Sequence, residues 1–463
     1  MMVRNHLREW MYQWRHLRKV RHITLDPRGP GVVRIHLIPP KWSPSGDVPS
    51  VALINGQDLL PVTLSWAILL SAFIDALAPF DGRELPEEGF EGILAETVRR
   101  VHRVYPGVPA ETLRTDLMRL VDACTAIARG QKPREEIGFV SFMAYAKHMA
   151  APHRMDLMVS AMHKNGEWHC NQKCLHCYAA DQPLSEKEEL GTDAWKRILH
   201  TLQKARIPQV TFTGGEPTLR NDLPELVQAA QWFVTRLNTN GVLMTKELCR
   251  RLSEASLDSV QITLYSADPA IHNELVGAEH FHNTAAGIQN ALEAGLSVSV
   301  NTPLCTRNAD YVGTLAYLRE LGVRYVTCSG LIVTGNAERE TSRRTQLAPE
   351  TMADILAGAK RYCDENDMEI SFTSPGWVDA QALGEMGFDA IPSCGACLSN
   401  MAIAPNGDVA PCQSWLSDAP LGNIQTDRFS KIWESRACKS IRAASAKMEH
   451  ICPLRKAEGE AKQ

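Results

Sequence analysis

The sequence predicts an α/β protein whose centre is a partial (β/α)6 barrel. From about residue 208 onward, short runs rich in β-branched residues alternate with longer amphipathic stretches, which is the order of βαβ units around a parallel sheet. The 463 residues exceed one ordinary core, so two or three domains are expected. The hydrophobic fraction of 44% and the charged fraction of 22% are typical of a soluble globular protein.

The barrel is assigned to residues 150–375 and is expected to contain six strands preceded by an opening strand. The opening strand is Asp156–Ala161, and the others are Gln209–Thr213, Phe233–Asn238, Ser259–Leu264, Ser297–Asn301, Arg324–Cys328 and Glu369–Phe372. Amphipathic helices between them are expected at Leu223–Gln231, Lys246–Ala255, Asn283–Ala294 and Tyr311–Leu321.

The residues before the barrel predict a separate small α+β module. We assign it to residues 46–135, after a basic N-terminal segment at 1–45. Its expected elements are strands at Val32–Leu37 and Val51–Ile54 and helices at 63–79, 91–104 and 110–129. The polar stretch GQKPREE at Gly130–Glu136 is the expected linker to the barrel.

Composition and charge exclude several classes of function. A net charge of −4 gives no general attraction to nucleic acid. The basic N-terminus lacks the apolar run and cleavage site of a secretory signal, so a cytoplasmic protein is expected. Its basic residues favour a solvated helix face, with docking to an anionic membrane or an acidic peptide as the alternative. The apolar segment Leu59–Leu77 is interrupted by Pro61 and Asp75, which favours a buried core helix over a membrane span.

Thirteen cysteines in a cytoplasmic chain indicate metal ligation for those that cluster. Cys170, Cys174 and Cys177 form a C-x3-C-x2-C motif after the opening strand. Three ligands leave one iron of a four-iron cluster free to bind a substrate or cofactor, whereas zinc, the alternative, usually takes four protein ligands. The single cysteines in apolar contexts are expected to be structural: Cys124, Cys249, Cys305, Cys328 and Cys363.

These residues resemble the radical S-adenosylmethionine (SAM) superfamily, which uses this spacing with a bulky residue before the last cysteine, here His176. The segment Thr213-Gly214-Gly215-Glu216-Pro217 follows the next strand. The resemblance implies that this segment binds the amino group of SAM, because glycines let a backbone approach a ligand and a carboxylate pairs with an ammonium.

Further positions along the barrel fit the same resemblance. Asn240, Ser266 and Asn301 stand at strand ends where the family contacts SAM, with a strand cap or turn as the alternative for each. His272–Gly277 with Phe281 fits an H-x4-G…F pattern, and Gly330–Asn336 fits a loop under the adenine.

The resemblance also implies the chemistry. A reduced [4Fe–4S] cluster held by Cys170, Cys174 and Cys177 would pass one electron to SAM, giving methionine and a 5′-deoxyadenosyl radical that abstracts hydrogen from the substrate. The implied partner is an electron donor such as flavodoxin or ferredoxin.

The second cysteine group, within residues 390–455, resembles the SPASM or twitch extension of peptide-modifying radical SAM enzymes. The turn Pro405–Asp408 predicts a hairpin that returns Cys412 toward Cys397. Arg455 stands where the full extension has its next cysteine, so one auxiliary [4Fe–4S] cluster is expected and residues 456–463 are assigned to a disordered tail. Its expected ligands are Cys394, Cys397, Cys412 and Cys452. Cys438 is the alternative to Cys452, and zinc is the alternative metal.

Residues 50–130, especially Glu96–Pro106 and Glu111–Val121, resemble the winged-helix domain that recognises leader peptides by adding them to a sheet edge. A generic helical scaffold is the alternative. Together the resemblances imply a maturase that binds a ribosomally synthesised precursor peptide and forms a crosslink or an epimerised residue. Epimerisation needs a thiol to return hydrogen, for which Cys305 and Cys328 are candidates. Two alternatives stay open: a radical SAM enzyme of small-molecule cofactor biosynthesis and a zinc-stapled binding protein.

Overall fold

The computed structural model of the chain consists of two compact units, which are described separately. One unit contains Met1–His153, Leu202–Gln209 and Trp232–Val234, and the other, the barrel unit, contains the remainder of the chain. The described residues are 2–27, 32–41, 48–56, 58–86, 88–128, 145–447 and 451–454. The predicted linker at Gly130–Glu136 and the predicted tail at 456–463 lie outside them.

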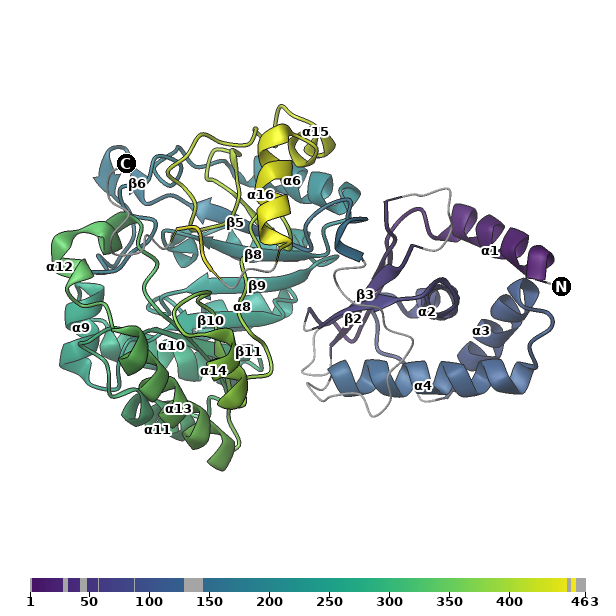
Figure 1. The fold of residues 1–463 in the computed structure, drawn as a ribbon, viewed down its shortest axis with the longest axis horizontal. Coiled ribbons are helices and arrows are strands. Elements are labelled where there is room, and N and C mark those ends of the chain that lie inside the picture. Colours follow the sequence, from purple (N-terminus) through teal and green to yellow (C-terminus); the bar gives the residue numbers. More distant parts are fainter. Residues whose placement is uncertain are drawn as a thin grey trace. The chain divides into compact units, whose positions relative to one another are not determined.

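The N-terminal unit contains a four-stranded antiparallel sheet packed against helices. The strands follow one another in the order of the chain: β1 (Arg21–Leu25), β2 (Val33–Ile38), β3 (Ser50–Ile54) and β4 (Asp58–Val62). The helices are α1 (Met2–His16), α2 (Leu64–Leu77), α3 (Phe90–Val104) and α4 (Ala110–Ala128), drawn in purple and blue in Figure 1. The α+β character predicted for this region is therefore confirmed, and the sheet begins before residue 46.

A single buried helix was expected over the apolar segment Leu59–Leu77. The structure instead has a strand followed by a helix in this segment. Pro61 has no N–H to donate and is found in the edge strand β4, where an unpaired position carries no penalty. Thr63 is extended and precedes the first turn of α2. Helix α2 is buried on nearly every side because β1 to β3 and the helices α1, α3 and α4 all contact it. Among the described residues, no helix has both the length and the apolar character needed to span a bilayer.

The barrel unit is built on a nine-stranded sheet with the order β13-β12-β11-β10-β9-β8-β5-β14-β15. Its parallel part consists of β5 (Arg154–Ser160), β8 (Gln209–Gly214), β9 (Val234–Thr239), β10 (Ser259–Thr263), β11 (Ser297–Pro303), β12 (Tyr325–Ser329) and β13 (Glu369–Phe372). Each of the seven predicted strands is present, with its ends shifted by at most two residues, so the predicted partial barrel is confirmed.

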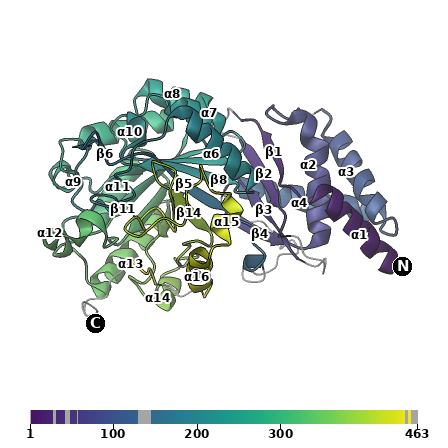
Figure 2. The same cartoon turned by 90° about the horizontal axis from the view of Figure 1, so that it is seen from above.

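Helices follow the strands and cover the outer face of the sheet, as Figure 2 shows for α7, α8 and α10. The bounds are α6 (Thr192–Lys204), α7 (Leu223–Ala229), α8 (Lys246–Glu254), α9 (Pro269–Val276), α10 (Phe281–Glu293), α11 (Tyr311–Glu320), α12 (Glu340–Arg343), α13 (Pro349–Glu365) and α14 (Ala380–Glu385). A small hairpin, β6 (His163–Lys164) and β7 (Glu167–Trp168), separates β5 from the first cysteine motif.

The C-terminal segment continues the sheet instead of forming a detached domain. Strand β14 (Asn400–Ile403) runs parallel to β5, with Asn400 opposite Arg154, and turns back into β15 (Val409–Ala410). The predicted hairpin at Pro405–Asp408 is therefore present. Two short helices, α15 (Phe429–Trp433) and α16 (Arg436–Ser445), follow it.

Candidate active site

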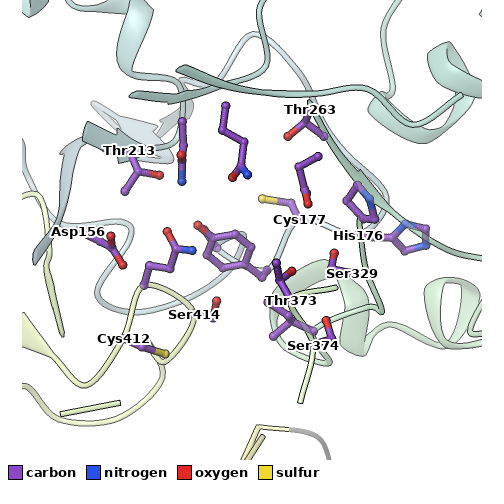
Figure 3. Close-up of a pocket in the computed structure, with 18 of the residues that line it drawn as sticks. Asp156, His176, Cys177, Thr213, Thr263, Ser329, Thr373, Ser374, Cys412 and Ser414 are labelled. Carbon is purple, nitrogen blue, oxygen red and sulfur yellow. The ribbon is translucent and has the colours of Figure 1, made fainter. Parts of the chain in front are cut away.

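A cavity of about 500 Å3 lies inside the barrel unit and is lined by residues of the parallel strands β5, β8, β9, β10, β11 and β12. Both cysteine groups reach it: Cys170, Cys174 and Cys177 from the first motif, and Cys394, Cys412 and Cys452 from the second. Figure 3 shows Cys177 and Cys412 among the side chains around it. A volume of this size is typical of cavities that bind small molecules. The two distant motifs thus meet at one candidate site.

The loop that carries the first three cysteines is held from below by the end of α9. Lys173 N donates to Val276 O at 3.0 Å, and Leu175 N donates to Leu275 O at 2.8 Å. Gly277, with a φ of +66°, ends α9 against this loop, and a Cβ there would stand 2.7 Å from Lys173 O. A side chain at residue 277 would push the cysteine loop away, which explains the glycine of the H-x4-G pattern.

Asn336 holds the same loop from the other side. Its backbone N donates to Cys177 O at 2.9 Å, and its side-chain Nδ2 donates to Cys174 O at 3.0 Å. The sequence predicted that Gly330–Asn336 forms a loop under the adenine. Residues 330–333 do line the cavity, whereas Asn336 is buried behind the cysteine loop and fixes its backbone.

The three thiols form a donor set suited to an iron-sulfur cluster. Burial raises the pKa of Cys170 to about 12, with a further contribution from the Glu216 carboxylate, and burial raises the pKa of Cys174 and of Cys177. Since iron binds thiolates, loading a cluster must release these protons. Among the described residues, no three His, Cys, Asp or Glu side chains converge on a single metal ion.

The structure shows a second reason, besides the expected approach to SAM, why residues 214 and 215 are glycines. A Cβ on Gly214 would stand 2.1 Å from Ser160 O, and one on Gly215 would stand 2.6 Å from Ala161 O. Gly214 also has a φ of +131°. The absent side chains therefore make room for the end of β5, while the glycine backbone lines the cavity.

Glu216 is buried and joins the end of β8 to the end of β9. Its Oε1 accepts hydrogen bonds from Thr218 N at 3.0 Å, Thr218 Oγ1 at 2.5 Å and Thr239 Oγ1 at 2.6 Å. Oε2 accepts one hydrogen bond, from Asn240 N at 2.9 Å. Burial raises the pKa of Glu216, and these hydrogen bonds oppose that shift. Oε2 thus keeps capacity for one further donor, which fits the ammonium of SAM.

His176 presents a buried acceptor that a ligand can satisfy. Thr345 Oγ1 donates to Ser342 O at 2.6 Å, so it must accept from His176 Nε2, which lies 2.7 Å away. This assignment leaves Nδ1 as an acceptor, without a partner among the described residues. Burial lowers the pKa of His176 to about 4, so the ring is neutral near pH 7.

The other predicted SAM positions divide into two groups. Asn240 and Asn301 line the cavity; Asn240 donates to Asn171 Oδ1 at 2.6 Å, beside Cys170, and Asn301 accepts from Thr327 at 2.9 Å. Pro217 and Ser266 are buried but absent from the lining. Ser266 Oγ accepts from Asp268 N at 3.0 Å, which is the turn role named as its alternative.

The structure places the cysteines of the second group in two different surroundings. The hairpin places Cys397 N 3.1 Å from Pro411 O, next to Cys412. Cys394, Cys412 and Cys452 line the cavity, and both other thiols contribute to the raised pKa of Cys412, which burial mainly causes. Cys397 is fully buried beside Cys438, and the hydrogen bond between their sulfur atoms raises the pKa of Cys397 and lowers that of Cys438.

The candidate thiols for returning hydrogen lie elsewhere. Cys305 and Cys328 are fully buried and absent from the lining of the cavity. Core packing, the alternative role, therefore accounts for both. The remaining single cysteines, Cys124, Cys249 and Cys363, are buried as well.

The sequence analysis missed the polar inner wall of the barrel. Arg154, Asp156, Arg236, Gln261 and Thr327 line the cavity, and none was singled out. The available signal was polar residues at every second position of strands that otherwise read as buried.

Two sequence families match the chain. The radical SAM superfamily matches residues 169–312, and SPASM, described as an iron-sulfur cluster-binding domain, matches residues 394–454. PqqA peptide cyclase of Streptomyces rochei is 28% identical over 295 residues, which are 61% of this chain and 79% of that protein. Mycofactocin maturase MftC of Mycobacterium tuberculosis is 29% identical over 282 residues, 58% of this chain and 68% of that protein.

Solved structures share the fold. SuiB of Streptococcus suis, bound to precursor peptide SuiA, superposes with a TM-score of 0.59 at 15% identity and covers 88% of this chain and 92% of its own. The structure of native anSMEcpe with bound AdoMet gives a TM-score of 0.51 at 18% identity, covering 64% of this chain and 84% of its own.

Proposed function

Because residues 169–312 match the radical SAM superfamily and residues 394–454 match the SPASM domain, we propose that the chain is a maturase of a ribosomally synthesised precursor peptide. The proposed reaction begins with hydrogen abstraction from the peptide and ends in a crosslink or an epimerised residue. Relatives named for a peptide cyclase and for a maturase support this substrate class, as does the SuiB fold with its bound precursor.

The observation that carries the proposal is the single cavity shared by both cysteine groups. A substrate in this cavity lies between the two sites where clusters are expected. The SPASM match names an iron-sulfur cluster, so zinc is not supported at the second group. The alternative of a zinc-stapled binding protein is dropped for the same reason.

The residues of the first site fit a [4Fe–4S] cluster and SAM. Cys170, Cys174 and Cys177 would hold the cluster. Glu216 Oε2, which accepts one hydrogen bond and can accept another, and His176 Nδ1, which has no partner among the described residues, would accept from SAM. When bound, these groups supply the reductive cleavage of SAM and the radical that abstracts hydrogen. Backbone of Gly214 and Gly215 closes the wall beside them.

The chain's own contribution is positioning and shielding. Hydrogen bonds from Asn336 and from α9 hold the cysteine loop in one place, and the barrel wall surrounds the reacting groups. Exclusion of bulk water protects a reactive radical from side reactions. Fixed polar groups on the strands then orient one C–H bond of the substrate.

For the second site we propose Cys394, Cys397, Cys412 and Cys452 as ligands of the auxiliary cluster. Three of them share the cavity, and Cys397 adjoins Cys412 through the hairpin. Cys438 is engaged with Cys397 and with Arg442, whose Nη1 donates to Cys438 Sγ at 3.7 Å.

The N-terminal unit is proposed to bind the leader of the precursor. Its antiparallel sheet has β1 and β4 as its outer strands, and an extended peptide can add to such an edge. The electron donor is proposed to be a flavodoxin or ferredoxin. Thirteen cysteines fit a reducing compartment, which favours the cytoplasm.

The test compares the anaerobically reconstituted chain with a variant in which Cys170, Cys174 and Cys177 are all alanine. Iron, sulfide and 5′-deoxyadenosine are measured in both. We expect the variant to keep about four irons and to lose SAM cleavage, since the second group still holds a cluster. A variant that holds no iron would contradict the auxiliary cluster. The mass of a co-expressed precursor peptide then decides the substrate class, and an unmodified peptide would favour a small-molecule substrate.

A further inference from the structure

The inner wall of the barrel is polar along the length of its strands. The cavity-facing residues of β5 to β12 include Asp156, Thr211, Thr213, Arg236, Asn238, Asn240, Gln261, Thr263, Asn301 and Thr327. Closed (β/α)8 barrels, by contrast, usually fill their interior with branched apolar side chains. A polar wall around an open cavity indicates that a polar ligand fills it.

Four charged side chains line this cavity among the described residues: Arg154, Asp156, Glu216 and Arg236. Arg154 and Asp156 form an ion pair, with 3.1 Å between Nε and Oδ1. Glu216 is satisfied by hydrogen bonds at the far ends of the strands. The positive charge of Arg236, near the start of strand β9, therefore has no carboxylate paired with it alone.

No described residue forms a hydrogen bond or an ion pair with the Arg236 guanidinium. The Arg236 side chain is partly buried, and it lines the cavity. Burial is the main cause that lowers the pKa of Arg236, followed by the nearby charge of Arg154, while the nearby carboxylate of Asp156 raises it. Arg154, Asp156 and Arg236 together carry one net positive charge, and Asp156 pairs with Arg154. A largely buried guanidinium without a hydrogen-bonded carboxylate is costly, so its presence points to a ligand that supplies a further negative charge.

The position of Arg236 favours the substrate over SAM as the source of that charge. Arg236 precedes Asn240 by four residues of strand β9, and a strand rises about 3.3 Å per residue, so their backbones lie about 13 Å apart. Glu216 meets the backbone of Asn240. The carboxylate and ammonium of SAM share one carbon, so a SAM anchored at Glu216 places its carboxylate near that upper end.

We infer that Arg236, supported by Arg154, binds a carboxylate of the peptide substrate, that is, an aspartate or glutamate side chain lowered into the barrel. A guanidinium can bind a carboxylate through two parallel hydrogen bonds, which fixes the residue's orientation as well as its charge. This inference rests on the proposed function for its substrate class. It adds that the modified segment carries an acidic residue close to the reacting position.

The test measures binding, so it does not depend on turnover. The reconstituted full-length chain with SAM is titrated calorimetrically with Ac-Gly-Glu-Gly-NH2 and with the isosteric Ac-Gly-Gln-Gly-NH2. The wild type should bind the glutamate peptide at least tenfold more tightly, and R236M should lose this preference while R236K keeps part of it. The matched control is R324M, because Arg324 is exposed and paired with Asp367. It should behave as the wild type.

Three results would overturn the inference. Wild type could bind both peptides equally, R236M could keep the preference, or R236M could lose SAM affinity tenfold with no preference in the wild type, which would assign the guanidinium to SAM. Substrate-free R236M should also unfold at a temperature no lower than the wild type. A clear fall would show that Arg236 serves the fold instead. Failure of SAM cleavage, by contrast, would contradict the proposed function and leave these binding results intact.

Discussion

Gly214 and Gly215 illustrate how one residue type answers two different needs. The motif suggested that glycine lets the backbone approach SAM, but the nearest atoms to the missing side chains are the carbonyls of Ser160 and Ala161. The sequence pattern identified the positions, because the approach of a ligand and the close packing of β5 both require glycine at the same two residues. It could not distinguish the reasons, because the end of β5 lies far away in the chain.

Replacing Gly214 by alanine should lower the free energy of unfolding by about 3 kcal/mol or more. The new Cβ would collide with Ser160 O, and the φ of +131° is strained for any side chain. Urea unfolding followed by circular dichroism measures the loss. The matched control is G295A: Gly295 also has a positive φ, +75°, but open space around it, so only about 1 kcal/mol should be lost. Equal losses would contradict the packing argument.

Glu216→Gln should weaken both the fold and SAM binding. The amide would place an N–H group against one of the donors that now point at the carboxylate, which costs about 1–3 kcal/mol. SAM affinity, measured by calorimetry, should fall at least tenfold because the ammonium loses its counter-charge. E225Q is the control, since Glu225 is exposed and pairs only with Lys196. Unchanged SAM affinity in folded E216Q would remove Glu216 from the site.

Secondary-structure elements of the barrel were predictable because each repeats a strong local pattern. The strands are short apolar runs and the helices are amphipathic, so Glu369–Phe372 was placed with both ends correct. Strands β1 and β4 were missed. Strand β1 lies in a basic stretch that favours a helix face, and β4 merges with the apolar run of α2, so periodicity alone could not separate them.

The connection between the 3₁₀ turn at Gly335–Glu338 and the cysteine loop should control cluster retention. In N336A the hydrogen bond from Nδ2 to Cys174 O is lost, which costs about 1 kcal/mol and loosens the loop. Iron release to an excess of chelator should therefore become several-fold faster. Asn366 also donates its Nδ2 to a carbonyl, that of Tyr362, but at the end of α13, so N366A should release iron as the wild type does. Equal rates in all three proteins would contradict the positioning role.

The ligand set of the auxiliary cluster makes a second prediction for these loops. Cys452→Ala should reduce the iron content by up to four per chain, because residue 452 shares the cavity with Cys394 and Cys412. Cys438→Ala should keep the iron, since Cys438 contacts Cys397 and Arg442 instead. Iron and sulfide analysis with electron paramagnetic resonance distinguishes the two variants. The opposite ranking would make Cys438 the ligand.

Across the whole molecule, the spacing of the cysteines predicted candidate metal donors, whereas the polar wall of the cavity was not predicted. The C-x3-C-x2-C motif and the hairpin are local, so their geometry follows from neighbouring residues. Arg236, Asp156 and Gln261 come from three different strands, and only the assembled sheet brings them to one cavity. Their common role depends on tertiary structure, which no local pattern reports.

Stability should fall as the solution becomes more acidic than about pH 6.5. Burial lowers the pKa of His153, His176 and His272 to about 4 each, whereas an unfolded histidine titrates near 6.5. Between these values the unfolded chain binds more protons, so each histidine should cost about 1 kcal/mol of unfolding free energy at pH 5.5 relative to pH 7.5.

The variant H272N tests this assignment. Asparagine can accept the Tyr265 N–H that His272 Nδ1 now accepts, but it does not titrate. The difference in unfolding free energy between pH 7.5 and 5.5, measured with urea, should therefore shrink by about 1 kcal/mol. An unchanged difference would mean that His272 is protonated in the folded chain.

The pairing of β14 with β5 limits how the C-terminal segment can be exchanged between related proteins. Strands β14 and β15 of the C-terminal segment belong to the same sheet as the barrel strands. Strand β14 pairs with β5 from Asn400 opposite Arg154 to Ile403 opposite Leu157. The segment is therefore not an interchangeable cassette. A chimera that takes the C-terminal segment from a relative must therefore also take a β5 that pairs with its β14. For the same reason, the sequences of β5 and β14 should change together among relatives.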